Sequence, residues 1–171
     1  MGFKVLHNIS YGVYVVSSKK GGDYNGCVMN SVIQTSAEPP TISICINREN
    51  LTYEYIRNSG VFTISILSQN VGLPFIGHFG FRSGKDFNKF AELDYKISEK
   101  TGAPVLMENS LGYIEAEVRD SMDVETHTIF AGNILYGENF NIEEKPLTYA
   151  HYHQVKKGKT PEKAPSYIKN D

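Results

Sequence analysis

The chain has 171 residues, of which 40% are hydrophobic, with nine Phe and eleven Tyr. This length suits one domain, which would bury roughly 70% of the surface that its unfolded chain exposes. The 17 basic and 19 acidic residues give a formal charge of −2. Neither sign dominates a long stretch, so no nucleic-acid partner is predicted.

The cysteines and the N-terminus indicate a cytoplasmic protein. Cys27 and Cys45 are too few for a disulfide framework or a four-thiolate metal site. The N-terminal residues lack a charged region followed by a long apolar core, so no secretory signal is expected. No run approaches the roughly 18 apolar residues of a membrane span. We therefore expect no membrane partner.

The first part of the chain alternates between strand and turn signals. The β-branched and aromatic composition of Tyr11–Ser17 predicts a strand. Lys19–Asp23 predicts a turn, and Asn25-Gly26 predicts a second turn of the kind that accepts positive φ. Cys27–Thr35 is expected to be extended. Pro39-Pro40 marks a strand entrance or edge, because proline lacks an N–H and restricts its neighbour.

A strand and a helix with clear boundaries follow. Thr41–Asn47 alternates three isoleucines with small polar residues, which predicts a half-buried strand. Asn50 is a candidate N-cap for a helix over Leu51–Asn58. Gly60 is expected to end that helix, because glycine accepts the left-handed conformation of a C-cap.

The second half of the chain predicts further strands and a few brief helices. Val61–Leu67 alternates, with Phe62, Ile64 and Ile66 expected to face inward. The other predicted elements are helices over 71–77 and 85–92 and extended segments over 94–98, 103–108, 112–121 and 125–136. Roughly six or seven closely spaced strands indicate an antiparallel barrel or sandwich. No Gly-x-Gly-x-x-Gly motif follows a strand, so a Rossmann fold is not expected.

The composition changes near the C-terminus. Beyond Val155 it shifts to Lys, Gly, Pro and Glu, which predicts a tail or linker. We therefore divide the chain into a domain over residues 1–155 and a C-terminal tail or linker over 156–171. The basic cluster at 156–159 lies in this tail and is expected to be solvated.

The segment from Asn25 to Pro40 is the first candidate for a ligand site. Its polar residues are Asn30, Ser31, Gln34, Thr35 and Ser36. They place donors and acceptors beside backbone N–H groups that a sheet need not use. A solvated strand edge explains the same residues without a ligand, and the residues alone favour that interpretation.

The strand-to-helix junction is the second candidate. It carries the polar residues Asn47, Arg48, Asn50 and Thr52. The first N–H groups of a helix, beside an arginine and short polar side chains, make a site for a phosphate. Ordinary capping with a solvent-facing arginine is the alternative, and the two interpretations are compatible.

Two weaker candidates complete the set. Asp123, Glu125 and His127, at a spacing of two, would lie on one face of a strand and could contact a metal. One short run supplies no full ligand set, so no metal site is predicted. Between 81 and 90, Arg82 and Lys85 could close over an anion, and Ser83 or Asp86 could cap a helix. No catalytic triad or nucleophile-elbow pattern is present, so hydrolysis is not expected.

In order along the chain, these motifs resemble the flavin reductase-like family. The resemblance is carried by Asn25–Pro40, the strand Ile42–Asn47, the run Phe81–Phe90 and the segment Glu125–Gly132, in which Glu125-Thr126 replaces the family's Gly-Asp. It extends over roughly residues 5–155. It implies a mainly β fold, the FMN-binding split β-barrel with antiparallel Greek-key order and a few short helices. It also implies a homodimer with the flavin near the subunit interface.

The resemblance also implies roles for individual residues. Met29, Asn30 and Ser31 would meet the isoalloxazine edge, and Thr35 and Ser36 would lie near the ring or ribityl chain. Asn47, Arg48, Asn50 and Thr52 would hold the ribityl and phosphate end, with Arg82 and Ser83 as further cofactor-binding residues. His127 is the expected catalytic residue, near the flavin where the nicotinamide docks.

The implied function is an FMN-dependent oxidoreductase. It would transfer hydride from NADH or NADPH to bound flavin and pass electrons to an acceptor such as rubredoxin. The Asn-Gly-Cys sequence and the Gln34-x-Ser36 spacing look similar to family members that are paired with rubredoxin. One alternative is an electron carrier with tightly bound FMN that a partner protein reduces. Another is a flavin-binding or storage protein without turnover.

Overall fold

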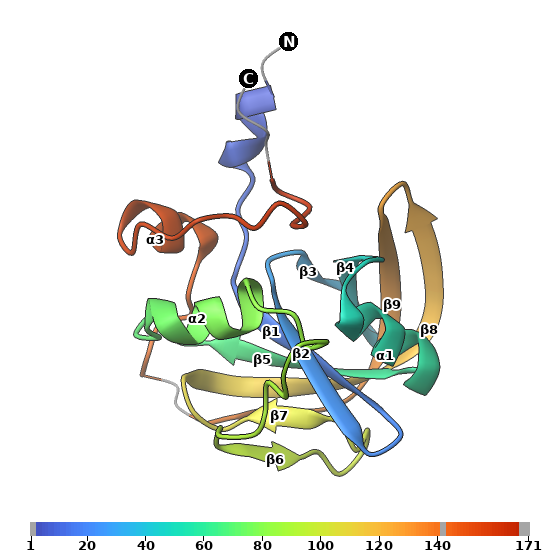
Figure 1. Cartoon of the computed structure of the whole chain (residues 1–171). Helices are drawn as coiled ribbons and strands as arrows, with labels where there is room; N and C mark the ends of the chain where they lie inside the picture. Colours follow the sequence, from blue (N-terminus) through green and yellow to red (C-terminus); the bar gives the residue numbers. More distant parts are fainter. Residues whose placement is uncertain (1–2, 141–142, 168–171) are drawn as a thin grey trace.

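The computed structural model describes residues 3–140 and 143–167, and one curved antiparallel sheet forms its centre (Figure 1). The elements are η1 (Phe3–Asn8), β1 (Tyr14–Lys20), β2 (Asp23–Met29), β3 (Val32–Ala37), β4 (Pro40–Asn47), α1 (Leu51–Ser59), β5 (Val61–Leu67), α2 (Leu73–Gly80), β6 (Tyr95–Ile97), β7 (Pro104–Leu106), β8 (Ser110–Val124), β9 (His127–Asn139) and α3 (Tyr149–Gln154). The large sheet has the order β2-β1-β5-β8-β9-β4-β3, and β6 and β7 form a separate pair. No described helix is long and apolar enough to cross a membrane.

The two ends of the large sheet close around one core. Val16 of β1 and Met29 of β2 belong to the same hydrophobic cluster as Ile44 of β4, although β2 and β4 lie near opposite ends of the strand order. Ile56 of α1 completes this cluster. Register shifts in the β5–β8 and β8–β9 pairs bend the strands where the sheet must curve. The fold is therefore the predicted mainly β split barrel with a few short helices.

A second hydrophobic cluster lies on the outside of the barrel. Val15 faces it, whereas its neighbour Val16 faces the interior, so β1 is buried on both faces. Phe79 of α2, Leu106 of β7 and Tyr152 of α3 cover this side. After α3 the chain, red in Figure 1, runs back across the top of the molecule towards β3 and β4.

Local signals predicted the β4–α1 junction correctly. The β4 strand begins at Pro40, and the three isoleucines predicted to share a face are buried. Asn50 caps α1, because its side chain accepts a hydrogen bond from the backbone N–H of Thr52. Gly60 ends the helix with φ +70°, a conformation that glycine adopts without steric strain.

The turn predicted at Asn25-Gly26 is wrong. Both residues lie inside β2, in register with β1, and the turn falls earlier, at the Gly-Gly pair that follows β1. A Cβ on Gly26 would lie 2.8 Å from Ser17 Oγ and 3.3 Å from the rings of Phe79 and Phe90. This glycine therefore allows close packing of aromatic rings on the strand, and long-range packing overrides the local turn signal.

The helix predicted over residues 85–92 is also wrong, because this segment forms a series of turns. The Asn88 side chain accepts a hydrogen bond from the N–H of Phe90 at 2.9 Å, and such local bonds compete with helical ones. Lys89 is only 3% exposed, and its Nζ donates to the carbonyl of Gly26 at 2.9 Å. Tertiary contacts with β2 therefore determine the shape of this loop.

The strand predicted to begin at residue 125 begins at His127. Glu125 and Thr126 form the turn of the β8–β9 hairpin, and Glu125 has φ +50°. Asp123 is the last but one residue of β8, Glu125 lies in the turn and His127 begins β9, so the three do not share a strand face. Among residues 3–140 and 143–167, no group of three His, Cys, Asp or Glu side chains could hold a metal ion.

Two smaller differences concern strand ends. The first strand begins at Tyr14 and not at Tyr11. Ile66 is half-buried, whereas Leu67 is fully buried. The register of β5 against β8 shifts between these two residues, so the alternation that the sequence predicts is interrupted there.

Candidate functional site

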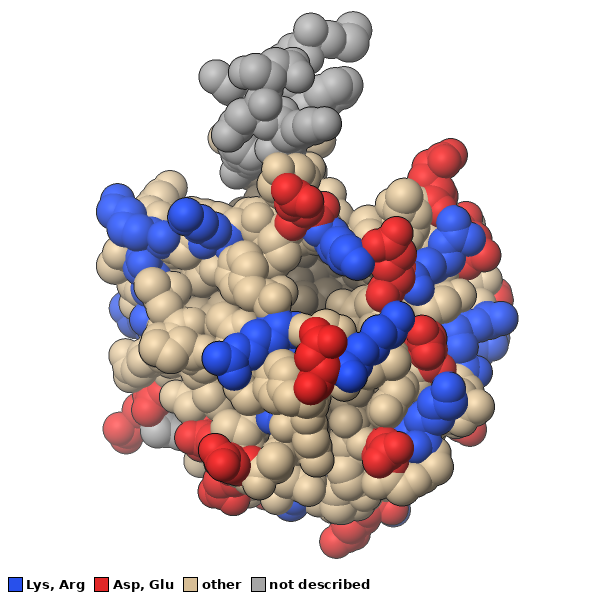
Figure 2. Space-filling view, in the orientation of Figure 1, with Lys and Arg blue, Asp and Glu red and all other residues tan. Residues whose placement is uncertain are grey.

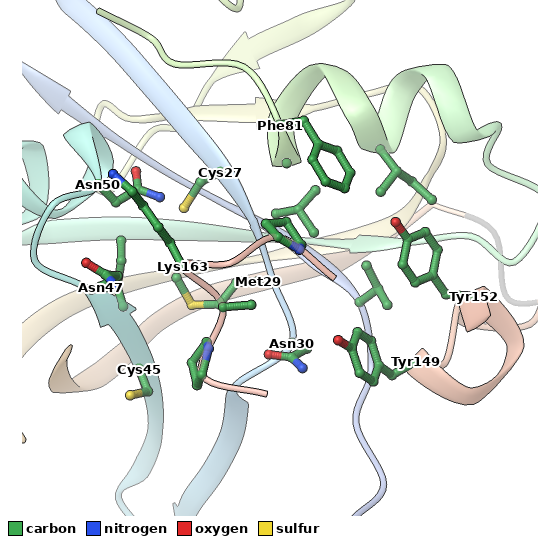
Figure 3. A pocket seen from close by; sticks show the side chains of 18 of the residues that line it. Cys27, Met29, Asn30, Cys45, Asn47, Asn50, Phe81, Tyr149, Tyr152 and Lys163 are labelled. Atoms are coloured by element: carbon green, nitrogen blue, oxygen red, sulfur yellow. The ribbon is translucent and has the colours of Figure 1, made fainter. Parts of the chain in front are cut away.

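A small cavity of about 80 Å³ lies where β2, β4, the end of α2 and the C-terminal segment meet (Figure 3). Four predicted site residues line it: Met29, Asn30, Asn47 and Asn50. The face shown in Figure 2 has a hollow near its middle, and side chains of both charge signs border it. The structure therefore brings together the ends of two predicted motifs that are about twenty residues apart in sequence.

The amide of Asn30 is a buried polar group at this cavity. The residue is 5% exposed. Its Nδ2 donates to Ser166 Oγ at 2.8 Å, and its Oδ1 accepts from Ser31 Oγ at 3.0 Å. A buried amide needs such partners, because an unsatisfied polar group is costly in the interior. Ser31 thus acts on the site through Asn30 and does not line the cavity.

The start of α1 forms a second wall. The Asn47 side chain accepts from the N–H of Glu49 at 2.9 Å, and the Asn50 side chain accepts from the N–H of Thr52 at 3.0 Å. The nine-residue helix thus begins at the cavity, with its partly positive end towards it. Such a helix start favours an anion, as the sequence predicts.

Aromatic and sulfur-containing side chains supply the apolar walls. Tyr149 and Tyr152 of α3 lie across the cavity from Asn47 and Asn50 in Figure 3, and Phe81 lies at the end of α2. Cys27 and Cys45 also line the cavity. Burial raises the pKa of both thiols, so they remain neutral near pH 7. The Cys27 side chain is buried at the cavity wall.

Two other predicted phosphate residues do not line the cavity. Arg48 forms an ion pair with Asp123 at 3.6 Å and donates to the carbonyl of Glu125. Thr52 is fully buried, and its hydroxyl accepts from Asn25 Nδ2 at 2.9 Å. Arg48 therefore contacts the β8–β9 hairpin, and Thr52 supports the start of α1.

The remaining predicted cofactor residues do not line the cavity. Thr35 and Ser36 lie on β3, and their hydroxyls are bonded within the β3–β4 segment. Arg82 stacks its guanidinium over a phenylalanine ring at 5.3 Å, and the Ser83 hydroxyl accepts a backbone N–H two residues on. Both follow Phe81, which does line the cavity. Their cofactor roles stay predictions.

His127 lies one contact away from the cavity. Its Nε2 is 3.3 Å from the carbonyl oxygen of Lys163, which lines the cavity, and its Nδ1 is 2.8 Å from Thr126 Oγ1. A carbonyl only accepts, so this arrangement places a proton on Nε2. The ring is oriented by one bond on each side.

The C-terminal segment is the part of the site that the sequence did not predict. Its cavity-lining residues are Lys159, Pro161, Lys163, Ala164 and Pro165. Lys163 Nζ also forms an ion pair with Glu49 at 2.7 Å, and this contact lowers the pKa of the Glu49 carboxyl. The composition of this segment predicts that it forms no hydrophobic core of its own. It does not show that the segment lies in a groove formed by other elements. The domain boundary at residue 155 stays a prediction.

Comparison with known proteins agrees with this architecture. The family described as flavin reductase like domain matches residues 6–157. The chain is 44% identical over 167 residues to a high molecular weight rubredoxin of Moorella thermoacetica, covering 98% of this chain and 72% of the relative. It is 39% identical over 170 residues to a ferric-chelate reductase (NAD(P)H) of Archaeoglobus fulgidus, covering 99% of both.

The fold is similar to that of solved structures. An NADH:FAD oxidoreductase of Streptomyces globisporus superposes with a TM-score of 0.75 at 22% identity, covering 84% of each chain. This likeness shows the fold, and the two relatives and the family match show the membership. The predicted family and enzyme class are thereby confirmed. The chain belongs to the flavin reductase-like family of oxidoreductases.

Proposed function

We propose that the chain is an FMN-dependent oxidoreductase that takes hydride from NADH or NADPH and passes electrons to an acceptor such as rubredoxin. The observation that carries the proposal is the junction of Asn47 and Asn50 at the cavity. There a helix start suited to a phosphate lies opposite the aromatic side chains of α3. The names of the two relatives, a ferric-chelate reductase (NAD(P)H) and a high molecular weight rubredoxin, support the donor and the acceptor.

The donor set fits FMN. The α1 N-terminus suits its phosphate, and the Asn30 amide can donate to a ring or ribityl oxygen. Tyr149 and Phe81 offer apolar surface to a planar ring. When bound, the flavin supplies the electron-accepting chemistry, which protein side chains lack. The cavity of about 80 Å³ is smaller than the roughly 300–1,000 Å³ of typical ligand pockets, so the C-terminal segment must move for a whole flavin to enter.

His127 is proposed as a positioning residue for the nicotinamide, because hydride transfer needs no protein base. We would compare His127→Ala with His127→Asn, which keeps a donor for the Lys163 carbonyl, in anaerobic NADH oxidation. The alanine variant should raise the KM for NADH more than it lowers kcat, and the asparagine variant should recover part of the loss. Unchanged NADH oxidation in His127→Ala would remove this role.

A homodimer with the flavin near the interface is part of the proposal. Cys45, Ile129 and Met122 are paired across β4, β9 and β8, so they share the outer face of the sheet. Ile33 extends this face on β3, and it and Met122 are 64% and 59% exposed. Because Cys45 also lines the cavity, this apolar face continues into the site. Sedimentation should give a dimer for the native chain and a monomer for Met122→Lys.

One experiment tests the oxidoreductase. The purified chain is loaded with FMN, freed of oxygen and mixed with NADH or NADPH in a stopped-flow cell. Rapid bleaching of the flavin absorbance supports the oxidoreductase. Bleaching only with a reduced partner protein supports the electron carrier, which closure of the cavity by the C-terminal segment also favours. Protein that cannot be loaded with any flavin would contradict both, and the storage function as well.

A further inference from the structure

Residues 159–167, here named the cover segment, contact several groups that the proposed function assigns to flavin. Ser166 accepts the hydrogen bond of the buried Asn30 amide at 2.8 Å. The Lys163 carbonyl accepts the His127 Nε2–H at 3.3 Å, and Lys163 Nζ forms an ion pair at 2.7 Å with Glu49 in the turn before α1. In Figure 3 the Lys163 side chain extends to the side of the cavity where Asn47 and Asn50 lie. The cover segment therefore meets both the polar wall and the helix start.

The cover segment and a flavin would need the same space and one of the same donors. Asn30 Nδ2 carries two N–H groups, and one of them donates to Ser166 Oγ in place of a flavin oxygen. Ser166 in turn donates to the Tyr149 hydroxyl at 2.9 Å, which ties the segment to the aromatic wall. With the segment in place only about 80 Å³ remains, less than a flavin requires. Occupancy by the segment and occupancy by flavin therefore exclude each other.

The cover segment is also held in a way that permits release. Lys163 and Pro165 are exposed, and the ion pair of Lys163 with Glu49 lies at the surface, where such pairs are weak. A crevice of about 1010 Å³ adjoins the segment, lined by Thr160, Ser166 and Tyr167 together with residues that precede β1 and form α3. The segment can swing into this space without disturbing the barrel core.

We propose that the cover segment competes with flavin within the same chain. It occupies the flavin pocket and must leave before FMN can bind. This inference rests on the proposed function. If the segment is docked in about nine of ten molecules, it lowers the apparent affinity for FMN about tenfold, because only the open fraction binds. Removing the segment should therefore raise the apparent affinity for FMN by the same factor.

The test uses a variant that ends at Thr160 and so lacks residues 161–167 of the cover segment, including Lys163 and Ser166. This variant keeps the bonds of Tyr152 to Lys159 and of Tyr149 to Thr160, so α3 remains supported. FMN affinity is measured by quenching of flavin fluorescence for the native and shortened chains. The shortened chain should bind FMN about tenfold more tightly and faster. Full-length Ser166→Ala, which removes only the contact with Asn30 and Tyr149, should give an intermediate gain.

A second readout does not depend on affinity. FMN should increase the rate at which trypsin cleaves after Lys163, because the displaced segment becomes accessible. Lys163→Met should raise FMN affinity, whereas the charge-matched Lys157→Met, outside the cavity lining, should not.

Equal or weaker FMN binding by the shortened chain, or protection of Lys163 by FMN, would overturn the competition and leave the oxidoreductase standing. Failure of both chains to bind FMN, with native circular dichroism, would overturn the proposed function and the competition together.

Discussion

The side-chain amide of Asn25 donates a 2.9 Å hydrogen bond to the hydroxyl of Thr52, and this bond joins β2 to the first turn of α1. Both residues are almost completely buried. Two walls of the cavity continue from these elements, since β2 leads to Met29 and Asn30 and the turn before α1 carries Asn50. The bond therefore sets the distance between the polar wall and the helix start.

Thr52→Val should destabilise the protein by about 1–3 kcal/mol, because the buried Asn25 amide loses its acceptor while the side-chain volume is kept. Thr52→Ser keeps the hydroxyl and should lose less. The free energy of unfolding from urea titrations measures both variants. A valine variant as stable as the native chain would mean that the bond does not hold β2 against α1.

Gly26→Ala should destabilise the protein by about 1–3 kcal/mol, because the new Cβ would lie within 3.3 Å of the rings of Phe79 and Phe90 and closer still to Ser17 Oγ. Gly77→Ala is the matched control, since a Cβ there meets nothing within 4 Å and lies in α2. The control should gain up to about 1 kcal/mol in helix propensity. Thermal unfolding of the two variants compares them, and similar midpoints would contradict the packing argument.

Asn50→Asp separates capping from ligand binding. Aspartate caps a helix as well as asparagine, and its charge is favourable at a helix start, so the free energy of unfolding should stay within about 0.5 kcal/mol of native. The added negative charge should nevertheless weaken FMN binding tenfold or more. Riboflavin, which lacks the phosphate, is the control ligand and should lose much less affinity. Equal losses for the two ligands would place the phosphate elsewhere.

Lys89 should make stability depend on pH at alkaline values. Burial lowers the pKa of its ammonium, and no described carboxylate forms an ion pair with it. Between that lowered pKa and the ordinary value of about 10.4, the unfolded chain binds more protons than the folded one. The free energy of unfolding therefore rises with pH across this window.

The variant Lys89→Met lacks this titration but keeps the other ionisable groups. The free energy of unfolding of the native chain, minus that of Lys89→Met, should increase as pH rises towards about 10.4. Denaturant titrations at a series of pH values measure this difference. A difference that is constant with pH would show that Lys89 titrates alike in the folded and unfolded chain.

Elements governed by neighbouring residues were predictable from the sequence. The Asn50 cap, the Gly60 stop and the isoleucine alternation of β4 are interactions within one or two turns or along one strand. The family motifs likewise located two walls of the cavity, because Asn30 and Asn47 belong to two motif segments that the fold brings together. Arg48 and Thr35 belong to the same motifs, yet their side chains are bonded elsewhere.

Elements governed by distant residues were not predictable in this way. Asn25-Gly26 has the composition of a turn, but two aromatic rings from later in the chain pack on it and keep it in a strand. The segment around Lys89 has the composition of a helix, but its ammonium is held by carbonyl groups of β2 and α2. In both places tertiary packing outweighs a local preference that is worth only fractions of a kcal/mol to about 1 kcal/mol per residue.

The sequence by itself determined the family and, through that resemblance, the split barrel, because the family motifs occur in order along the chain. Periodicity and caps determined individual strands and the start of α1, because they depend on neighbouring residues. Only the tertiary structure decided that the C-terminal segment lies on the site. The contacts of Ser166 with Asn30 and of Lys163 with His127 and Glu49 join residues 36 to 136 positions apart. These contacts form because polar donors at the site need acceptors, and the C-terminal segment supplies them. Composition and periodicity do not reveal such pairs.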